Sequence, residues 1–247
     1  PPPAYGEDGG RPGAICELLD RLQEIDGIRW VRILYAYPER ISDEFIAAMV
    51  RNTKVVPYLD LPIQHCDDAV LKAMNRRGGR KEIEDAIARL RAAIPGITLR
   101  TTLIAGFPGE TEEQYAELCD FVKTVRFDRL GCFAYSAEEN TVAAKMPNQI
   151  DEETKQRRAD HIMELQAEVS AEREGEKVGH TYECICDGVD DETGMYLLRT
   201  KADCPEIDGN VLTPADTPLE TGAFYKVTIT DSDTYDLYGY AEERLED

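Results

Sequence analysis

The sequence lacks long apolar runs and has few His. No stretch approaches the roughly 20 apolar residues of a membrane span, and no signal peptide is evident. There are only three His, and the seven Cys are scattered. No Cys-x-x-Cys, His-x-x-x-His or Walker pattern is present, and nothing assembles a nucleophilic triad. These absences argue against a membrane protein, a common zinc site and a P-loop. An odd number of Cys in a long chain predicts reduced thiols and a cytoplasmic protein.

Positively charged residues are also scarce, and they are scarcest in the last quarter of the chain. The chain has 28 Lys and Arg against 49 Asp and Glu, a formal net charge of −21. Residues 180–247 hold 17 acids and only 4 bases, so this short tail carries −13 of that charge. Such a surface should repel phosphate backbones and attract basic partners. Solubility alone is the other interpretation of the acidic tail.

Helical and strand-like segments alternate through the first two thirds of the chain. This alternation predicts βα units around a parallel sheet with right-handed crossovers. We expect helices at 14–25, 42–50, 67–74, 81–94, 111–125 and 151–173, and strands at 30–35, 55–61, 101–105 and 129–135. Four strands are too few for a closed eight-stranded barrel, so the sheet should be open or incomplete.

The pattern changes after Gly179. Five short runs separated by turn residues follow, and residues such as Val227 and Ile229 alternate with polar neighbours. Short strands at this spacing predict a small closed antiparallel barrel of the oligonucleotide-binding type. The chain is therefore expected to be α/β, with one domain at 1–179 and a second at 180–247.

The stretch from Arg100 to Thr111 organises the first domain. A β-branched strand ends at Gly106-Phe-Pro-Gly109, and Thr111 with Gln114 forms a capping box that opens a helix. In a β/α barrel this edge holds ligands, and the backbone N–H groups of such a turn favour a carboxylate, a phosphate or ribose oxygens. The same pattern also fits an ordinary βα turn without a ligand.

Other residues carry possible chemistry. Gln64 and His65 follow a strand end and should lie at the mouth of the barrel, where His65 is either structural or catalytic. Arg100 either pairs with a carboxylate or is a solvated charge. The basic run at 76–81 binds nucleic acid or an acidic tail, or is a solvated loop. Cys184-x-Cys186 should share one strand face, which favours burial over metal binding.

Several of these stretches in combination resemble one family. They are Tyr35-Ala-Tyr-Pro38, Tyr58-Leu-Asp-Leu-Pro-Ile-Gln-His65, Ala73-Met-Asn-Arg-Arg77, Thr102-Leu-Ile-Ala-Gly-Phe-Pro-Gly-Glu-Thr111 and Phe133-Ala-Tyr-Ser136. The set resembles the radical SAM methylthiotransferases, and the tail resembles the TRAM domain of those enzymes. The run Thr200-Lys-Ala-Asp-Cys-Pro-Glu-Ile-Asp-Gly209 is most similar to the RimO branch, which modifies an aspartate of the twelfth small-subunit ribosomal protein.

The resemblance implies a partial TIM-like (β/α) radical SAM barrel followed by a TRAM barrel. It also implies a radical enzyme with two [4Fe–4S] clusters, one of which cleaves S-adenosylmethionine. The resulting deoxyadenosyl radical would abstract hydrogen from the aspartate β-carbon, and the second cluster would deliver the methylthio group. A basic ribosomal protein would be the partner, and the full-length enzyme would be monomeric.

The resemblance also implies roles for single residues. Those expected to face S-adenosylmethionine are Gln64, His65, Arg100, Thr102, Gly106, Glu110, Phe133 and Tyr135. Those expected to face the protein substrate are Lys201, Asp203, Glu206 and Asp208. No catalytic or metal-binding residue is assigned.

One departure from the family pattern is large. The cluster-binding C-x-x-x-C-x-x-C motif is absent, and so are the family's N-terminal domain and first two barrel strands. Cluster ligation needs thiolates at fixed positions, so we expect a C-terminal portion that is inactive alone. Two alternatives stay open: a fragment of the tRNA-adenosine-modifying, MiaB-like branch, and a non-enzymatic ribosome-binding module. The acidic tail disfavours nucleic acid as its own partner.

Overall fold

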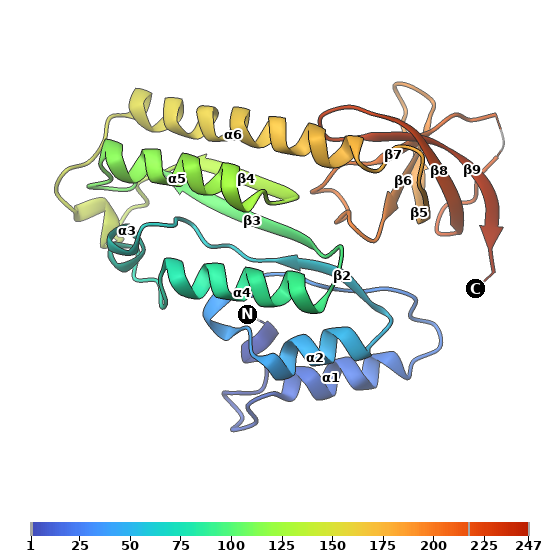
Figure 1. The fold of residues 1–247 in the computed structure, drawn as a ribbon, viewed down its shortest axis with the longest axis horizontal. Helices are drawn as coiled ribbons and strands as arrows, with labels where there is room; N and C mark the ends of the chain where they lie inside the picture. The colour runs from blue at the N-terminus through green and yellow to red at the C-terminus, as the bar shows by residue number, and fades with distance from the viewer. Residues whose placement is uncertain (1, 217, 247) are drawn as a thin grey trace. The chain divides into compact units, whose positions relative to one another are not determined.

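The computed structural model describes residues 2–216 and 218–246, and the chain divides into two compact units, Pro1–Gln166 and Ala167–Asp247 (Figure 1). The elements of the first unit are η1 (Pro2–Ala4), α1 (Ala14–Gln23), β1 (Val31–Ile33), η2 (Pro38–Arg40), α2 (Asp43–Arg51), β2 (Val55–Asp60), α3 (Asp68–Ala73), α4 (Arg80–Ala93), β3 (Thr98–Ala105), α5 (Glu112–Val125), β4 (Arg129–Ala134) and η3 (Ala143–Lys145). The helix α6 (Glu152–Gly175) continues into the second unit, which holds β5 (Thr181–Val189), β6 (Tyr196–Thr200), β7 (Val211–Thr213), β8 (Phe224–Ser232) and β9 (Leu237–Leu245). In the described ranges, no helix is long and apolar enough to span a membrane.

The first unit is built on an open parallel sheet. Its strand order is β1-β2-β3-β4, and every neighbouring pair is parallel. The four strands expected from the sequence are therefore confirmed. Because the order follows the chain, right-handed crossovers place α2, α4 and α5 on one face of the sheet. All carboxyl ends of the strands consequently meet at one edge.

Side-chain caps define where the helices of this unit begin. The Ser42 hydroxyl accepts the Phe45 N–H before α2, and Asp151 accepts the Thr154 N–H at 2.8 Å before α6. Thr111 and Gln114 form the expected capping box at α5. These side chains satisfy N–H groups that have no partner within the helix.

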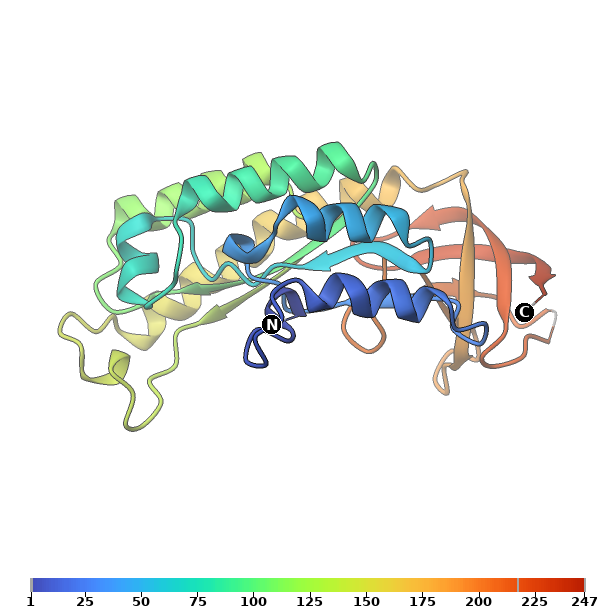
Figure 2. The same ribbon diagram turned by 90° about the horizontal axis from the view of Figure 1, so that it is seen from below.

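Ion pairs between Arg and carboxylate side chains join neighbouring helices of the first unit. Arg51 of α2 binds Asp20 of α1, which lies beside it (Figures 1 and 2). Arg89 of α4 binds Asp43 of α2 at 3.0 Å. Arg80, also of α4, binds a carboxylate of α5. Such exposed pairs are individually weak, so they fix the order of the helices while the apolar core beneath them supplies most of the stability. That core contains Leu59, Leu99 and Leu103, which are fully buried.

The second unit contains a closed five-stranded barrel in the order β5-β6-β7-β9-β8. The expectation of a small closed barrel is confirmed, but the expectation of purely antiparallel pairing is wrong for one pair. Strands β7 and β9 are parallel, with Val211 opposite Leu237. Parity explains the difference, because a closed ring with an odd number of strands cannot alternate direction throughout. Cys184 and Cys186 share the buried face of β5, as their spacing predicts.

Gly239 sits where two strands of this barrel approach closely. A Cβ added there would lie 2.5 Å from the carbonyl oxygen of Thr228 on β8. We expect Gly239→Ala to lower the free energy of unfolding by about 1–3 kcal/mol, because the backbone must move. Gly175→Ala is the matched control, since its Cβ would meet only Ser232 Oγ at 4.0 Å. Urea unfolding of both variants measures the difference, and equal midpoints would contradict the expectation.

Candidate active site at the carboxyl edge of the sheet

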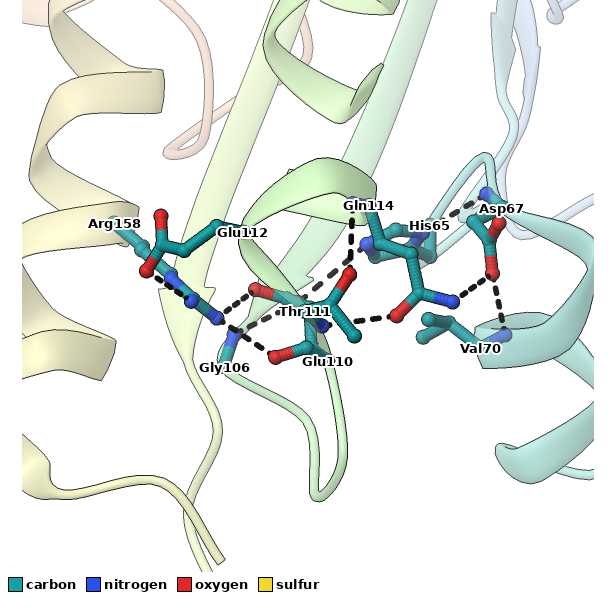
Figure 3. A network of polar contacts seen from close by, with 9 residues as sticks. All are labelled: His65, Asp67, Val70, Gly106, Glu110, Thr111, Glu112, Gln114 and Arg158. Atoms are coloured by element: carbon teal, nitrogen blue, oxygen red, sulfur yellow. Dashed lines mark hydrogen bonds and ion pairs between the residues drawn. The ribbon is translucent and has the colours of Figure 1, made fainter. Parts of the chain in front are cut away.

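Segments that follow β2 and β3 bring a polar network to the carboxyl edge of the sheet (Figure 3). His65 comes from the loop after β2, and Glu110 from the turn after β3. Arg158 reaches the same point from α6. Side-chain exposure is 0% for His65 and Glu110 and 4% for Arg158, so this cluster of charged and titratable groups is almost fully removed from water.

Glu110 is the centre of the network. Its Oε2 accepts the Gly106 N–H at 3.0 Å, and its Oε1 accepts from Arg158 Nη1 at 2.7 Å. Arg158 Nη2 also donates to Glu112 at 2.6 Å, at the start of α5. A buried carboxylate needs such compensation, because removing the charge from water is costly. Glu110 therefore ties the turn after β3 to α6.

His65 is held in one tautomer by its neighbours. Its Nδ1 accepts the Asp67 N–H at 2.9 Å, so the ring hydrogen lies on Nε2. Nε2 lies 3.4 Å from Glu110 Oε2, and no well-aligned hydrogen bond to the described residues forms there. His65 Nε2 thus faces the carboxylate that Arg158 already pairs with.

The same network connects two helix N-termini. Asp67 Oδ1 accepts the Val70 N–H at 2.9 Å and caps α3. The same oxygen accepts from Gln114 Nε2 at 2.8 Å, while Gln114 completes the capping box at α5. One carboxylate oxygen therefore joins the loops after β2 and β3 (Figure 3).

Gly106 permits the close approach of α6. Its φ is +76°, a conformation that residues with a side chain rarely adopt, and an added Cβ would lie 2.3 Å from Lys155 Cγ. The Lys155 side chain is only 3% exposed. Its ammonium group lies 5.5 Å from the centre of the Tyr135 ring. A buried cation therefore lies between the ends of β3 and β4.

Several polar atoms at this edge are buried without a hydrogen-bond partner in the described chain. They include Gln64 Oε1, His65 Nε2 and the Tyr135 hydroxyl. Gln64 also has a φ of +72°, which is strained for a residue with a side chain. Its backbone is nonetheless fixed against β3, because Ile104 N–H donates to the Gln64 carbonyl at 2.8 Å. Tyr135 packs edge-on against Phe107. Unsatisfied buried polar atoms of this kind suit a bound ligand.

The remaining residues expected to face S-adenosylmethionine are more dispersed. Arg100 pairs with the buried Asp60 at 3.2 Å, so the pairing interpretation of Arg100 is the one observed. Thr102 is half-buried on β3, and its carbonyl accepts the Gln64 N–H. Phe133 is 61% exposed on β4. The structure therefore gathers Gln64, His65, Gly106, Glu110 and Tyr135 at the edge and leaves the other three along the strands.

The four residues expected to face a protein substrate differ in their exposure. Asp203 is buried and accepts from the Thr200 N–H and hydroxyl. Asp208 accepts the Cys204 N–H at 2.8 Å. Lys201 pairs with Glu183 at 3.0 Å. Glu206 is exposed, with a φ of +62°. Asp203 and Asp208 thus stabilise the turn, while Glu206 lies at its surface.

Sequence reasoning missed Lys155 and Arg158. A signal was present, because both lie on the face of α6 that also carries the buried Ala159, Ile162 and Leu165. Cations at apolar positions of an amphipathic helix indicate buried partners. The partner of Arg158 lies 48 residues away, a separation at which no local pattern can pair them.

The thiols of this chain do not form a metal site. In the described ranges, no three His, Cys, Asp or Glu side chains are placed to hold a metal ion. Six of the seven Cys are buried. Burial raises the pKa of Cys66 to about 12, and that of Cys132 likewise to about 12. Iron–sulfur ligation requires several thiolates at fixed positions, and no such group is gathered in the described ranges, so these residues do not fit a cluster.

The Glu110–Arg158 pair gives a direct test of the network. We expect Arg158→Met to lower the free energy of unfolding by about 3–5 kcal/mol, because it leaves a buried carboxylate uncompensated. Adding Glu110→Gln should restore part of the loss. The adjacent Arg157→Met is the control, because the Arg157 side chain is 59% exposed, and a change below about 0.5 kcal/mol is expected. If the two single Arg variants unfold at the same urea concentration, the pair is not a structural centre.

Comparison with known protein families agrees with this architecture. A model of the radical SAM superfamily matches residues 9–122, and a TRAM domain model matches residues 178–241. Among solved structures, the chain is similar to coproporphyrinogen III oxidase from Escherichia coli, a radical SAM enzyme. The TM-score is 0.53 at 20% identity, covering 64% of this chain and 37% of that one. This likeness supports the fold alone.

Other proteins are more similar to this chain in sequence than that structure is. Ribosomal protein uS12 methylthiotransferase RimO of Bdellovibrio bacteriovorus is 45% identical over 234 residues, covering 94% of this chain and 51% of the relative. The RimO of Pelobacter propionicus is 46% identical over 241 residues, covering 97% and 53%. The chain thus spans about half the length of the curated relatives it matches. Its motifs, its two domains and these relatives together show that the chain belongs to the radical SAM methylthiotransferase family, in the RimO branch.

Proposed function

We propose that this chain forms part of a RimO-type enzyme that adds a methylthio group to an aspartate β-carbon of a ribosomal protein. The observation that carries the proposal is the 45% identity to a uS12 methylthiotransferase across nearly the whole chain. The edge of the sheet supports it, because buried polar atoms without partners in the described chain lie there beside a fixed charge network. A cytoplasmic location is part of the proposal.

S-adenosylmethionine fits the donor set at this edge. Gln64 Oε1 can accept a hydrogen bond and the Tyr135 hydroxyl can donate or accept one. Gly106 has no side chain, so α6 can bring Lys155 close to the turn beside these two atoms. When bound and reductively cleaved, S-adenosylmethionine supplies a deoxyadenosyl radical. The chain's own residues would bind and orient the molecule and exclude water from it, since the hard chemistry belongs to the cofactor.

His65 and Glu110 would act as positioning residues in this proposal. Both side chains are fully buried, and Glu110 already accepts from Gly106 N–H and Arg158. They would hold the turn after β3 rigid, although His65 Nε2, 3.4 Å from Glu110 Oε2, has no hydrogen-bond partner in the described chain. A rigid turn lowers the entropy lost on binding.

The thiols of this chain do not fit the iron–sulfur clusters of the family, so they are given no part in the chemistry of a cluster. In this proposal, the full-length enzyme holds two such clusters. Their ligands would come from sequence outside these 247 residues.

Iron–sulfur reconstitution tests this assignment. After anaerobic incubation of the chain with iron and sulfide, we expect no stoichiometric iron and no charge-transfer absorbance, because the thiols in the described ranges are not gathered into a ligand set. Iron content and the visible spectrum are the measurements. A stable cluster would contradict the assignment, and Cys66→Ser and Cys132→Ser would then identify ligands.

The acidic barrel is proposed to dock the basic ribosomal protein. Residues 180–247 carry 17 acids and 4 bases, and complementary charge steers association and fixes orientation. Glu206 is the exposed member of the expected docking turn. The proposed partner is therefore a basic protein, in accordance with the uS12 named for the relatives.

Salt dependence tests the docking. Titration of the full chain with uS12 should give a dissociation constant that rises steadily with salt, since surface charge is screened. Glu206→Gln should weaken binding without changing the unfolding midpoint. Asp203→Asn should instead lower stability, because its carboxylate supports the turn. Salt-independent binding, or preference for tRNA over uS12, would count against this partner.

A further inference from the structure

A cavity in the first unit lies where the segments after β1 and β2 meet. It has a volume of about 230 Å³, and its lining includes Tyr37, Glu39 and Arg40 from the first segment and Arg76 and Arg77 from the second. The first segment follows the carboxyl end of β1, and the second follows α3 but is tied to the end of β2, because Arg76 donates to the Pro62 carbonyl. The cavity therefore lies on the same edge of the sheet as the candidate active site, although its residues take no part in the network around Glu110.

The Arg side chains of the basic run at 76–81 differ in whether other residues bind them. Arg80 binds Glu84 and Glu117 and is fully engaged in the helix layer. Arg76 is held in place, because its guanidinium lies 4.5 Å from the centre of the Tyr37 ring and donates to the Pro62 carbonyl. Arg77 is exposed and has no ion pair or hydrogen bond within residues 2–216 and 218–246. The basic run thus contributes one fixed and one free guanidinium to the cavity.

The charge balance of the cavity is positive. Arg40 is neutralised by Glu7, both of whose oxygens lie 2.8 Å from Arg40 Nη1. Among the remaining lining residues, Glu39 contributes one negative charge, whereas Arg76 and Arg77 contribute two positive charges. In a chain with a net charge of −21, a positive hollow stands out from the remaining surface. It selects an anion rather than the basic protein proposed for the barrel.

We propose that this cavity binds a phosphate group of an RNA strand. Guanidinium groups match phosphate oxygens in geometry, and their hydrogen bonds to a charged acceptor are strong. Stacking on Tyr37 orders Arg76 in advance, so less side-chain entropy is lost on binding. Arg77 supplies a second cation from the adjacent backbone position.

The choice of RNA rests on the proposed function. A ribosomal protein is surrounded by RNA, so a strand next to the target aspartate would reach the same edge of the sheet as the active site. The phosphate contact would then position the substrate assembly, while the acidic barrel repels RNA from its own surface. An acidic peptide is the competing ligand and is included in the test.

Binding of a fluorescein-labelled oligouridylate to the full chain, followed by anisotropy at low salt, tests the site. Arg77→Ala should weaken binding about three- to tenfold and reduce the slope of log K against log salt by about 0.7, the value for one single-strand phosphate contact. Glu39→Gln should strengthen binding, because it removes the opposing carboxylate. Arg21→Ala is the matched control, because Arg21 is an exposed cation on α1 that does not line this cavity. It should leave binding unchanged.

Competition identifies the ligand chemistry. Inorganic phosphate at millimolar concentration should displace the oligouridylate from the wild type, and a polyglutamate peptide should not. Equal effects of Arg77→Ala and Arg21→Ala would overturn the proposal, and so would displacement by polyglutamate alone. The assay needs neither clusters nor S-adenosylmethionine. Loss of this binding and failure of the methylthiotransferase assignment are therefore separate results.

Discussion

The buried ion pair between Glu110 and Arg158 is the constraint on which the first unit depends. The carboxylate sits at the end of the turn after β3 and the guanidinium on α6, and neither side chain is more than 4% exposed. Because two charges without water must remain paired, the turn, the start of α5 and α6 are fixed relative to one another. Gly106 then takes its left-handed conformation against Lys155 as a consequence of that arrangement.

This constraint separates support from recognition at the edge of the sheet. His65, Asp67 and Gln114 use their polar atoms to join loops and cap helices. Gln64 and Tyr135 retain buried atoms that no described residue satisfies. Apart from His65, whose Nε2 also lacks a partner in the described chain, the residues that make the edge rigid are thus different from those that remain open to a ligand. A site built in this way loses little entropy when the ligand arrives.

Much of the fold could be predicted because its signals are local. The capping box of Thr111 and Gln114 and the β-branched run before it located the βα unit correctly. Strand β3 begins at Thr98 rather than at residue 101, because Thr98 to Arg100 pair with Tyr58 to Asp60 across the sheet. No property of Arg100 alone indicates that pairing. The partners of Asp60 and Glu110 are likewise set by tertiary packing, and the sequence pattern of the turn at 200–209 does not show that Asp203 faces inward.

The parallel seam of the barrel has a consequence for folding during synthesis. Strand β9 pairs antiparallel with the preceding strand β8 and parallel with the three-residue strand β7. The ring therefore cannot close until β9, its last strand, has left the ribosome. Before then, β7 and β8 each present an unpaired edge, which favours association with other chains. The final strand thus decides when the nascent barrel becomes protected.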